Sequence, residues 1–371
     1  MHIKPFIMEN WFKKYRPFVK YNLADSGVRD LTIKQIFELC GKDVAALNDI
    51  KLEYKDSRGS EELRKAITQT YISVNPENIL VTTSTSEALF IFLNEVLSPG
   101  DTVILEFPAF QSLYEVPRAL GCNVKFLKLK YEEGYLPNIS RLKELIDTRT
   151  KLIVINNPHN PTGSMLRSEE LSKIWEIAES CGAYLLADEH YRFLPLDGTE
   201  TVSSMVDLNN KIIGTGSITK CFGMIGLRMG WLIGPSKLLQ QCQIFKDYLT
   251  HVLSPISDFI ATMVIKNREV ILKKNIQMIK KNVTVFESFI SRHNDILSWV
   301  PPKGGAVCFP KYNLDISSDR FCECLIDQED VFLLPGSCFE KEGFFRVCLG
   351  VENKLFTEAI ERMDKYLRRQ K

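Results

Sequence analysis

Short apolar runs alternate with amphipathic segments along the first two thirds of the chain. The apolar runs predict buried β-strands at 79–82, 102–105, 124–127, 152–155 and 183–188. Between them, apolar residues at helical spacing predict helices around 87–97, 139–147 and 168–181. Such alternation predicts an α/β fold with a mostly parallel sheet sandwiched by helices. In such folds ligands bind at the carboxyl ends of the strands.

The alternation stops after residue 250. Helical patterns run from about 256 to 293, and short strands and a closing helix at 352–369 follow them. This pattern predicts a second, smaller α+β lobe. We therefore predict an N-terminal arm that forms part of the small domain (1–45), a large ligand-binding domain (46–250) and a small C-terminal domain (251–371).

Composition narrows the class of protein. The chain has 371 residues, of which 45% are hydrophobic and 25% charged, and its formal net charge is +1. We expect no nucleic-acid partner, because no long basic block is present. The longest apolar run, 88–93, is far too short to span a membrane. Ten scattered cysteines and five histidines predict neither a disulfide framework nor a metal site, and the start lacks a signal peptide. We expect a cytoplasmic location.

Lys220 lies in a polar turn between two apolar runs. Ser217 precedes it by three residues and Arg228 follows it by eight. A lysine at a strand end is partly desolvated, which favours the neutral amine that attacks a carbonyl. Ser217 and Arg228 are donors suited to a phosphate. The combination predicts a phosphorylated aldehyde bound as a Schiff base, namely pyridoxal 5'-phosphate, although the Ser-x-x-Lys pattern alone is also common on protein surfaces.

Polar and aromatic residues follow the other predicted strands. Thr85 and Ser86 lie in a hydroxyl-rich turn (83–86) between a strand and the helix predicted at 87–97. The free N–H groups at such a helix start form a cradle for an anion. Phe110 lies just beyond the next strand, where its face can stack on a heterocycle. Asp188 ends a strand and can keep a pyridine nitrogen protonated, and Tyr191 can donate to the ring's phenolic oxygen. Each residue alone also fits an ordinary helix cap or core position.

Three further features concern the substrate. Arg346 lies inside an apolar strand and needs an anion, which is either a substrate carboxylate or an internal acid. Ser26 and Gly27 form a predicted turn where backbone can approach a ligand. Glu9 and Asp25 are nearby carboxylates that are either solvated or functional.

Taken together, the motifs resemble class I/II aminotransferases, the aspartate-aminotransferase-like enzymes of fold type I. The matching motifs, in family order and spacing, are Asn160-Pro161-Thr162-Gly163, Asp188-x-x-Tyr191, Ser217-x-x-Lys220 with Arg228, and Phe345-Arg346-Val347. The resemblance covers essentially the whole chain. One departure is Ser84, which stands where the phosphate loop of the family usually carries glycine.

This resemblance implies a role for each residue. Lys220 would be the Schiff-base lysine and proton shuttle, and Arg346 would bind the substrate carboxylate. The implied cofactor contacts are the pyridine nitrogen (Asp188), the phenolic oxygen (Tyr191, Asn160), the ring face (Phe110) and the phosphate (Thr85, Ser86, Ser217, Arg228). Tyr54 matches the family tyrosine that reaches the phosphate of the neighbouring subunit, so the resemblance implies a homodimer.

A narrower resemblance concerns capreomycidine synthase and related enzymes, which cyclise hydroxyarginines on this fold. It rests on residues 8–11, 25–28, 86–90 and 253–255. It implies an amino acid substrate whose guanidinium needs a carboxylate, with Glu9 as first candidate and Asp25 as second. Two alternatives remain: a conventional aminotransferase, and a non-catalytic regulator. We rank the regulator last because the sequence shows no basic helix-turn-helix.

Overall fold

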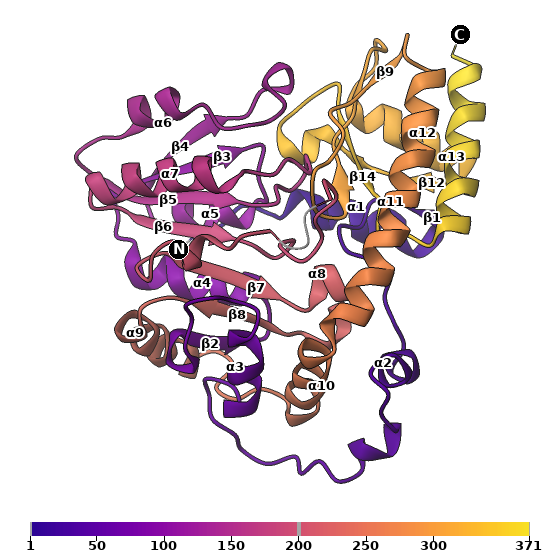
Figure 1. Cartoon of the computed structure of the whole chain (residues 1–371). Coiled ribbons are helices and arrows are strands. Elements are labelled where there is room, and N and C mark those ends of the chain that lie inside the picture. The colour runs from indigo at the N-terminus through magenta and orange to yellow at the C-terminus, as the bar shows by residue number, and fades with distance from the viewer. Residues whose placement is uncertain (1, 199–201, 371) are drawn as a thin grey trace.

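A seven-stranded sheet forms the centre of the large lobe in the computed structural model, which describes residues 2–198 and 202–370. The strand order is β2-β8-β7-β6-β5-β3-β4 (Figure 1). β8 is antiparallel to both of its neighbours, and the other pairs are parallel. The strands are β2 (Ile79–Thr82), β3 (Thr102–Phe107), β4 (Asn123–Lys128), β5 (Thr150–Asn156), β6 (Tyr184–Asp188), β7 (Ile213–Ser217) and β8 (Gly230–Ile233). The predicted α/β class with a mostly parallel sheet is confirmed.

The strands are apolar throughout because both faces of the sheet are covered. Leu152 and Val154 of β5 pack into the core formed with α4, α5 and α9, whereas Ile153 and Ile155 pack into the core that contains α3, α6 and α7. Alternate side chains of one strand thus enter opposite cores. The helices of this lobe are α3 (Glu61–Thr68), α4 (Thr85–Val96), α5 (Ser112–Ala119), α6 (Ile139–Leu145), α7 (Ser168–Ser180), α8 (Thr219–Phe222), α9 (Ser236–Asp247) and α10 (Pro255–Lys266).

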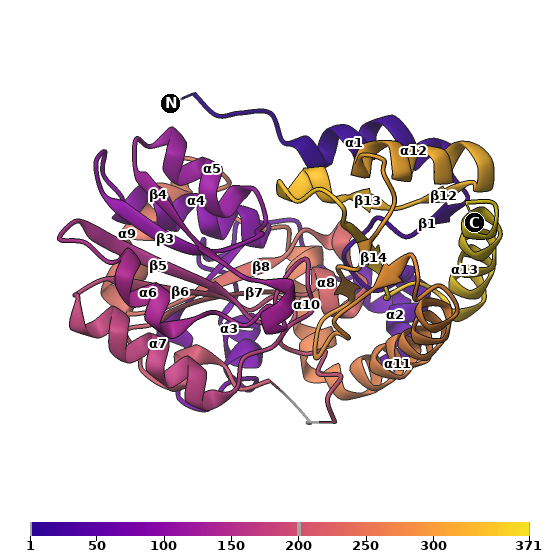
Figure 2. The same cartoon turned by 90° about the horizontal axis from the view of Figure 1, so that it is seen from above.

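The second lobe contains short strands flanked by three long helices (Figure 2). Its C-terminal elements are α11 (Arg268–Arg292), β9 (Leu297–Ser298), β10 (Val307–Cys308), β11 (Lys311–Tyr312), α12 (Ser318–Glu329), β12 (Val331–Phe332), β13 (Leu334–Pro335), β14 (Phe345–Cys348) and α13 (Asn353–Arg368). β14 lies between β10 and β13 and is antiparallel to both. The helical patterns predicted from about 256 to 293 correspond to two helices, α10 and α11, which are separated at Asn267, where the chain leaves helical geometry.

The N-terminal arm packs against this second lobe. Its elements are α1 (Ile7–Tyr15), β1 (Tyr21–Asn22) and α2 (Ile33–Leu39). β1 pairs in parallel with β12, and Met8 and Phe12 of α1 join an apolar cluster with Phe332. Residues more than 300 positions apart in sequence therefore share one core. The domain boundaries at 45/46 and 250/251 remain predictions.

Seven short 3-10 helices complete the described chain. They are η1 (Arg16–Phe18), η2 (Val44–Leu47), η3 (Pro76–Asn78), η4 (Tyr131–Glu133), η5 (Met205–Asp207), η6 (Ile225–Leu227) and η7 (Gly336–Phe339). Among the described residues, no helix is both long enough and apolar enough to cross a membrane.

Candidate active site

Lys220 lies on α8, the short helix that follows β7. Its Nζ donates a hydrogen bond to Ser26 Oγ at 2.8 Å. Burial, assisted by the positive charge of Arg346, lowers the pKa of Lys220 from 10.5 to about 8. The strands around the lysine pack closely, since a Cβ on Gly216 would lie 2.5 Å from Trp231 and a Cβ on Gly230 would lie 2.6 Å from the Thr85 nitrogen. Glycine is required at both positions for this reason.

Asp188 ends β6 beside β7 and is only 1% exposed. Its Oδ1 accepts a hydrogen bond from Thr215 Oγ1 at 2.8 Å and lies 3.0 Å from His190 Nδ1. Its Oδ2 is buried and has no hydrogen-bond partner within the described structure. Burial would raise the pKa of Asp188, but His190 and Thr215 outweigh burial and lower it below 3.8. The carboxylate is therefore ionised with one oxygen available.

Arg346 is a buried cation on β14. Its Nη1 donates to Asn160 Oδ1 at 3.1 Å and its Nη2 to the Ala24 carbonyl at 2.8 Å, while Nε has no partner within the part of the chain that is described. No carboxylate of the described residues forms an ion pair with it, and burial lowers its pKa. A buried guanidinium without a counter-ion is a binding site for an anion.

Asn160 is fixed by hydrogen bonds around the end of β5. The Asn156 side chain accepts from the Asn160 nitrogen at 2.6 Å and donates to the Asp188 carbonyl at 2.8 Å. Glu106 Oε2 in turn accepts from the Asn156 nitrogen, and burial raises the pKa of Glu106 to about 8. This network links the loop of Asn160 to the strand of Asp188.

One cavity of about 770 Å³ brings most of the predicted residues together. Its lining includes Glu9, Asp25, Ser26, Gly27, Thr85, Ser86, Phe110, Asn160, Asp188, Lys220 and Arg228. Three other predicted residues contact this lining. Tyr191 donates to the Ser26 carbonyl, Ser217 Oγ lies 2.8 Å from Thr219 Oγ1, and Arg346 contacts Asn160.

The N-terminal strap, which we define as residues 23–31, covers Lys220. The Val28 nitrogen donates to the Lys220 carbonyl at 2.9 Å, and the Leu31 nitrogen donates to the Gly223 carbonyl at 2.9 Å. Gly27 packs against Lys220, because a Cβ on it would lie 3.5 Å from the lysine. The predicted turn at Ser26 and Gly27 thus approaches the lysine itself.

The N-terminus of α4 faces the same cavity. Ser84 caps this helix by accepting from the Glu87 nitrogen, so that Thr85 and Ser86 begin the first turn. The φ of Ser84 is −173°, an extended conformation that any residue adopts. Serine in place of the usual glycine therefore creates no backbone conflict here. Arg228 has a φ of 51°, and its Nη1 donates to the Ile225 carbonyl at 3.2 Å, which leaves its other donors available.

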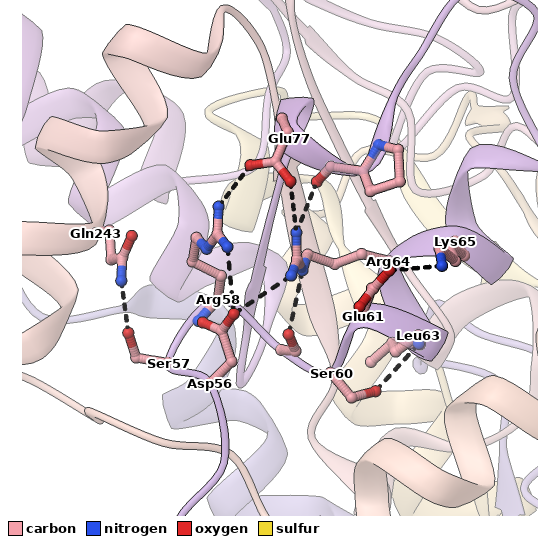
Figure 3. A network of polar contacts seen from close by, with 12 residues as sticks. Asp56, Ser57, Arg58, Ser60, Glu61, Leu63, Arg64, Lys65, Glu77 and Gln243 are labelled. Carbon is pink, nitrogen blue, oxygen red and sulfur yellow. Dashed lines mark hydrogen bonds and ion pairs between the residues drawn. The ribbon is translucent and has the colours of Figure 1, made fainter.

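Tyr54 does not line the cavity of its own chain. Its side chain is 81% exposed, and its ring is 5.9 Å from that of His251. The turn that follows Tyr54 is firmly anchored, because Asp56, Arg58, Arg64 and Glu77 form a network of ion pairs (Figure 3). A fixed turn thus carries an exposed aromatic ring.

Among the cavity-lining residues that were not predicted from the sequence, two pair with predicted carboxylates. His190 contacts Asp188, and Arg16 Nη2 lies 2.5 Å from Asp25 Oδ1. A signal for His190 existed, since it lies between Asp188 and Tyr191 at the strand end. Arg16 had no comparable signal, because its pairing depends on how the arm folds back.

Comparisons with known proteins identify the family of the chain. Residues 22–363 match the family described as aminotransferase class I and II. The chain belongs to this family. It is similar to capreomycidine synthase of Streptomyces vinaceus, with 26% identity over 346 residues, 92% of this chain and 88% of that protein.

Two solved structures extend the comparison. The PLP-dependent cyclase OrfR is similar with a TM-score of 0.94 and 25% identity, covering 100% of this chain and 99% of that one. The aspartate aminotransferase of Thermus thermophilus, represented by a double mutant, is similar with a TM-score of 0.88 and 25% identity, covering 98% and 97%. The predicted aspartate-aminotransferase-like fold is confirmed.

Members of this family use pyridoxal 5'-phosphate, and the site fits that cofactor. The free Oδ2 of Asp188 suits a protonated ring nitrogen, the Lys220 amine suits the aldehyde, and the α4 N-terminus suits the phosphate. When bound, the cofactor supplies an aldehyde for the lysine and a ring that takes up negative charge from a substrate Cα. We propose that Thr85, Ser86, Ser217 and Arg228 bind the phosphate, that Phe110 stacks on the ring, and that Tyr191 and Asn160 bind its phenolic oxygen.

We expect the rate of cofactor attachment to the cofactor-free protein to depend on pH through Lys220. Only the neutral amine attacks the aldehyde, and its pKa of about 8 means that the neutral form declines as the pH falls below 8. The rate should therefore rise about tenfold from pH 6 to pH 7 and level off near pH 9. Stopped-flow absorbance in the visible region measures this rate. A rate that is independent of pH over this range would contradict the assignment.

Proposed function

We propose that the chain is a PLP-dependent cyclase that converts a hydroxyarginine to a cyclic guanidino amino acid with loss of water. The observation that carries the proposal is the presence of Glu9 and Asp25 among the carboxylates that line the cavity containing Lys220. A conventional amino donor has no cation that needs them, whereas a guanidinium does. The similarity to capreomycidine synthase and to the cyclase OrfR supports the same reaction.

The two carboxylates differ in their partners. Asp25 is paired with Arg16 and also accepts from Asn22 Nδ2 at 2.7 Å. Glu9 is exposed at the cavity, and within the described residues it has no hydrogen bond or ion pair. Glu9 is therefore our first candidate for the substrate guanidinium, and Asp25 is the second.

The proposed reaction breaks one carbon–oxygen bond and forms one carbon–nitrogen bond. Lys220 removes the Cα proton while Arg346 holds the α-carboxylate, and Ser26 Oγ is the hydrogen-bond partner that orients the lysine amine. A β-hydroxyl can leave once the Cα proton has been removed, whereas a γ-hydroxyl leaves only after a Cβ proton has been removed as well. The hydroxyl leaves with a proton as water, a guanidine nitrogen loses a proton and bonds to the carbon that carried the hydroxyl, and the protons taken from carbon are returned to it. No oxidant and no 2-oxo acid are consumed. A β-hydroxyl gives a six-membered ring of the capreomycidine type, and a γ-hydroxyl gives the five-membered ring of L-enduracididine.

We favour L-enduracididine formation from γ-hydroxyarginine. Segments 8–11, 25–28, 86–90 and 253–255 resemble capreomycidine synthase and its relatives, and among these relatives we favour the L-enduracididine cyclase of guanitoxin biosynthesis. This resemblance favours a role for the enzyme in specialised-metabolite or toxin biosynthesis. It gives the γ-hydroxylated substrate priority over the β-hydroxylated one.

The alternative function is that of a conventional amino acid aminotransferase. The similarity to the aspartate aminotransferase of Thermus thermophilus favours this activity. Both activities need the same lysine and the same carboxylate-binding arginine. The two functions differ in the fate of the amino group, which an aminotransferase removes and a cyclase retains.

Incubation of purified enzyme with β- and with γ-hydroxyarginine, followed by mass spectrometry, tests the proposal. We expect a cyclic product lighter than the substrate by one water, formed without any 2-oxo acid acceptor. Formation of a keto acid that depends on an added acceptor would instead establish the aminotransferase. Arginine without a hydroxyl serves as the control, because it has no leaving group and should give no cyclic product.

We expect Glu9→Ala to weaken the use of guanidino substrates selectively. Loss of a hydrogen bond between charged groups should lower kcat/KM for hydroxyarginine by about 10- to 100-fold, with little change in cofactor binding. Steady-state kinetics and cofactor titration measure the two quantities. Glu361→Ala is the matched control, because Glu361 is exposed on α13 and does not line the cavity. Equal losses in catalysis and cofactor binding would indicate a structural role for Glu9.

We also propose that the enzyme is a homodimer. The exposed Tyr54 matches the tyrosine that in this family contacts the cofactor phosphate of the neighbouring subunit. The ion-pair network of Figure 3 fixes the turn beside Tyr54, which supports a role in presenting the ring to a partner. Sedimentation equilibrium of the purified protein tests the proposed state.

A further inference from the structure

His190 is a buried residue of the cavity to which neither the family motif nor the sequence assigns a role. It follows the end of β6, is 8% exposed, and lines the same cavity as Lys220. Its Nδ1 lies 3.0 Å from Asp188 Oδ1, whereas Nε2 is buried without a partner in the described structure. Among the described residues, the only side-chain hydrogen-bond partner of the ring is therefore the carboxylate of Asp188.

The chain around His190 is fixed on several sides. Glu189 points away from the cavity, where its carboxylate accepts from Ser204 Oγ and from the Met205 nitrogen, each at 2.6 Å. The His190 carbonyl accepts from Cys221 Sγ at 3.0 Å, next to Lys220. The imidazole also packs edge-on against the Tyr191 ring, with centroids 4.6 Å apart. These contacts leave the imidazole little freedom to turn away from Asp188.

The hydrogen bonds to Asp188 are strongly asymmetric. Oδ1 has two side-chain partners, His190 and Thr215, and Oδ2 has none within the described chain. A carboxylate fixed through one oxygen presents the other in a defined direction. Because a buried carboxyl tends to take up a proton, Asp188 also needs donors to remain ionised. His190 provides one of these donors through Nδ1.

We propose that His190 is a positioning residue for the cofactor: it binds Oδ1 of Asp188, keeps this carboxylate ionised, and thereby leaves Oδ2 to pair with the protonated ring nitrogen. With Nδ1–H donated to the carboxylate, the neutral imidazole carries no proton on Nε2, so the tautomer is fixed. The role applies to a cyclase and to an aminotransferase alike, and it does not depend on the identity of the substrate.

The test uses His190→Phe and His190→Asn in the cofactor-loaded enzyme. Phenylalanine retains a ring beside Tyr191 but cannot donate a hydrogen bond. In asparagine, the side-chain amide nitrogen is separated from Cα by the same number of bonds as Nδ1 of histidine, so it can replace the donor. The readout is the pH at which the visible absorbance of the bound cofactor changes. We expect this pH to rise by about one unit in His190→Phe. Without the hydrogen bond from His190, the ring nitrogen is held less firmly in its protonated form. The ring then draws less electron density from the group whose loss of a proton changes the absorbance, so that group keeps its proton to a higher pH.

His190→Asn is expected to restore most of the wild-type value. Loss of cofactor during dialysis should be several-fold faster in His190→Phe than in His190→Asn. If His190→Phe does not fold, His190→Leu replaces it and is held to the same outcome. The proposal would be overturned if the absorbance titration of the folded His190→Phe or His190→Leu variant is unchanged. It would also be overturned if phenylalanine and asparagine cause equal shifts. In either case His190 would be a packing residue.

Discussion

Replacement of Lys220 by alanine is expected to abolish both the visible absorbance of the bound cofactor and turnover. Lys220 lines the same cavity as Asp188, and it is desolvated enough to act as nucleophile and base. Loss of a general base alone can lower the rate by up to about 10⁴-fold. Absorbance spectra and product formation from γ-hydroxyarginine measure the two effects.

The matched control is Lys211→Ala. Lys211 is exposed and forms an ion pair with Glu179 away from the cavity, so both properties should remain at wild-type level. Normal turnover by Lys220→Ala would show that another group removes the Cα proton and would invalidate our assignment. Loss of absorbance in both variants would instead indicate unfolding, which far-ultraviolet circular dichroism measures directly.

Asp188→Asn is expected to have the second-largest effect. Asparagine retains the shape of the side chain but carries no charge, so it cannot stabilise a protonated ring nitrogen. Removal of a group that stabilises developing charge typically costs about 10²- to 10³-fold in kcat. We expect a loss of this size with the cofactor still covalently attached, as single-turnover kinetics on the loaded enzyme would show.

Asp247→Asn is the control for this substitution, because Asp247 does not line the cavity. Asp247 belongs to α9, and its Oδ1 lies 3.8 Å from Nδ1 of His251. A kcat for Asp188→Asn close to that of wild type would mean that the ring nitrogen is not held by this carboxylate. A kcat restored by excess cofactor would show that the substitution affects binding and not chemistry.

The large lobe could be predicted from sequence because its strands are buried on both faces. Short uninterrupted apolar runs, such as the one around Ile153, are typical of strands in a parallel sheet that helices cover on both sides. The helix α5 was missed because Pro117 lies inside it, and proline normally argues against a helix interior. The break at Asn267 was missed because both flanking helices carry apolar faces and no proline or glycine separates them.

For the site, local order in the sequence was sufficient for residues at or shortly after a strand end. Asp188 ends β6, Lys220 follows the end of β7 on α8, and the cavity contains both. The contact of Ser26 with Lys220 joins positions 194 residues apart, and no local pattern encodes it. The absence of an ion-pair partner for Arg346 among the described acids is a property of the tertiary structure, since the sequence is compatible with either an internal partner or a substrate carboxylate.

The N-terminal strap is hydrogen-bonded to both lobes at once. Its Leu23 and Arg29 nitrogens donate to the carbonyls of Phe332 and Gly350, whereas Val28 donates to the carbonyl of Lys220. A rotation of the smaller lobe must therefore pull on the same short segment that carries Ser26. The hydroxyl that partners the reactive amine is thus held by a segment anchored to both lobes, and its position depends on how the two lobes are packed.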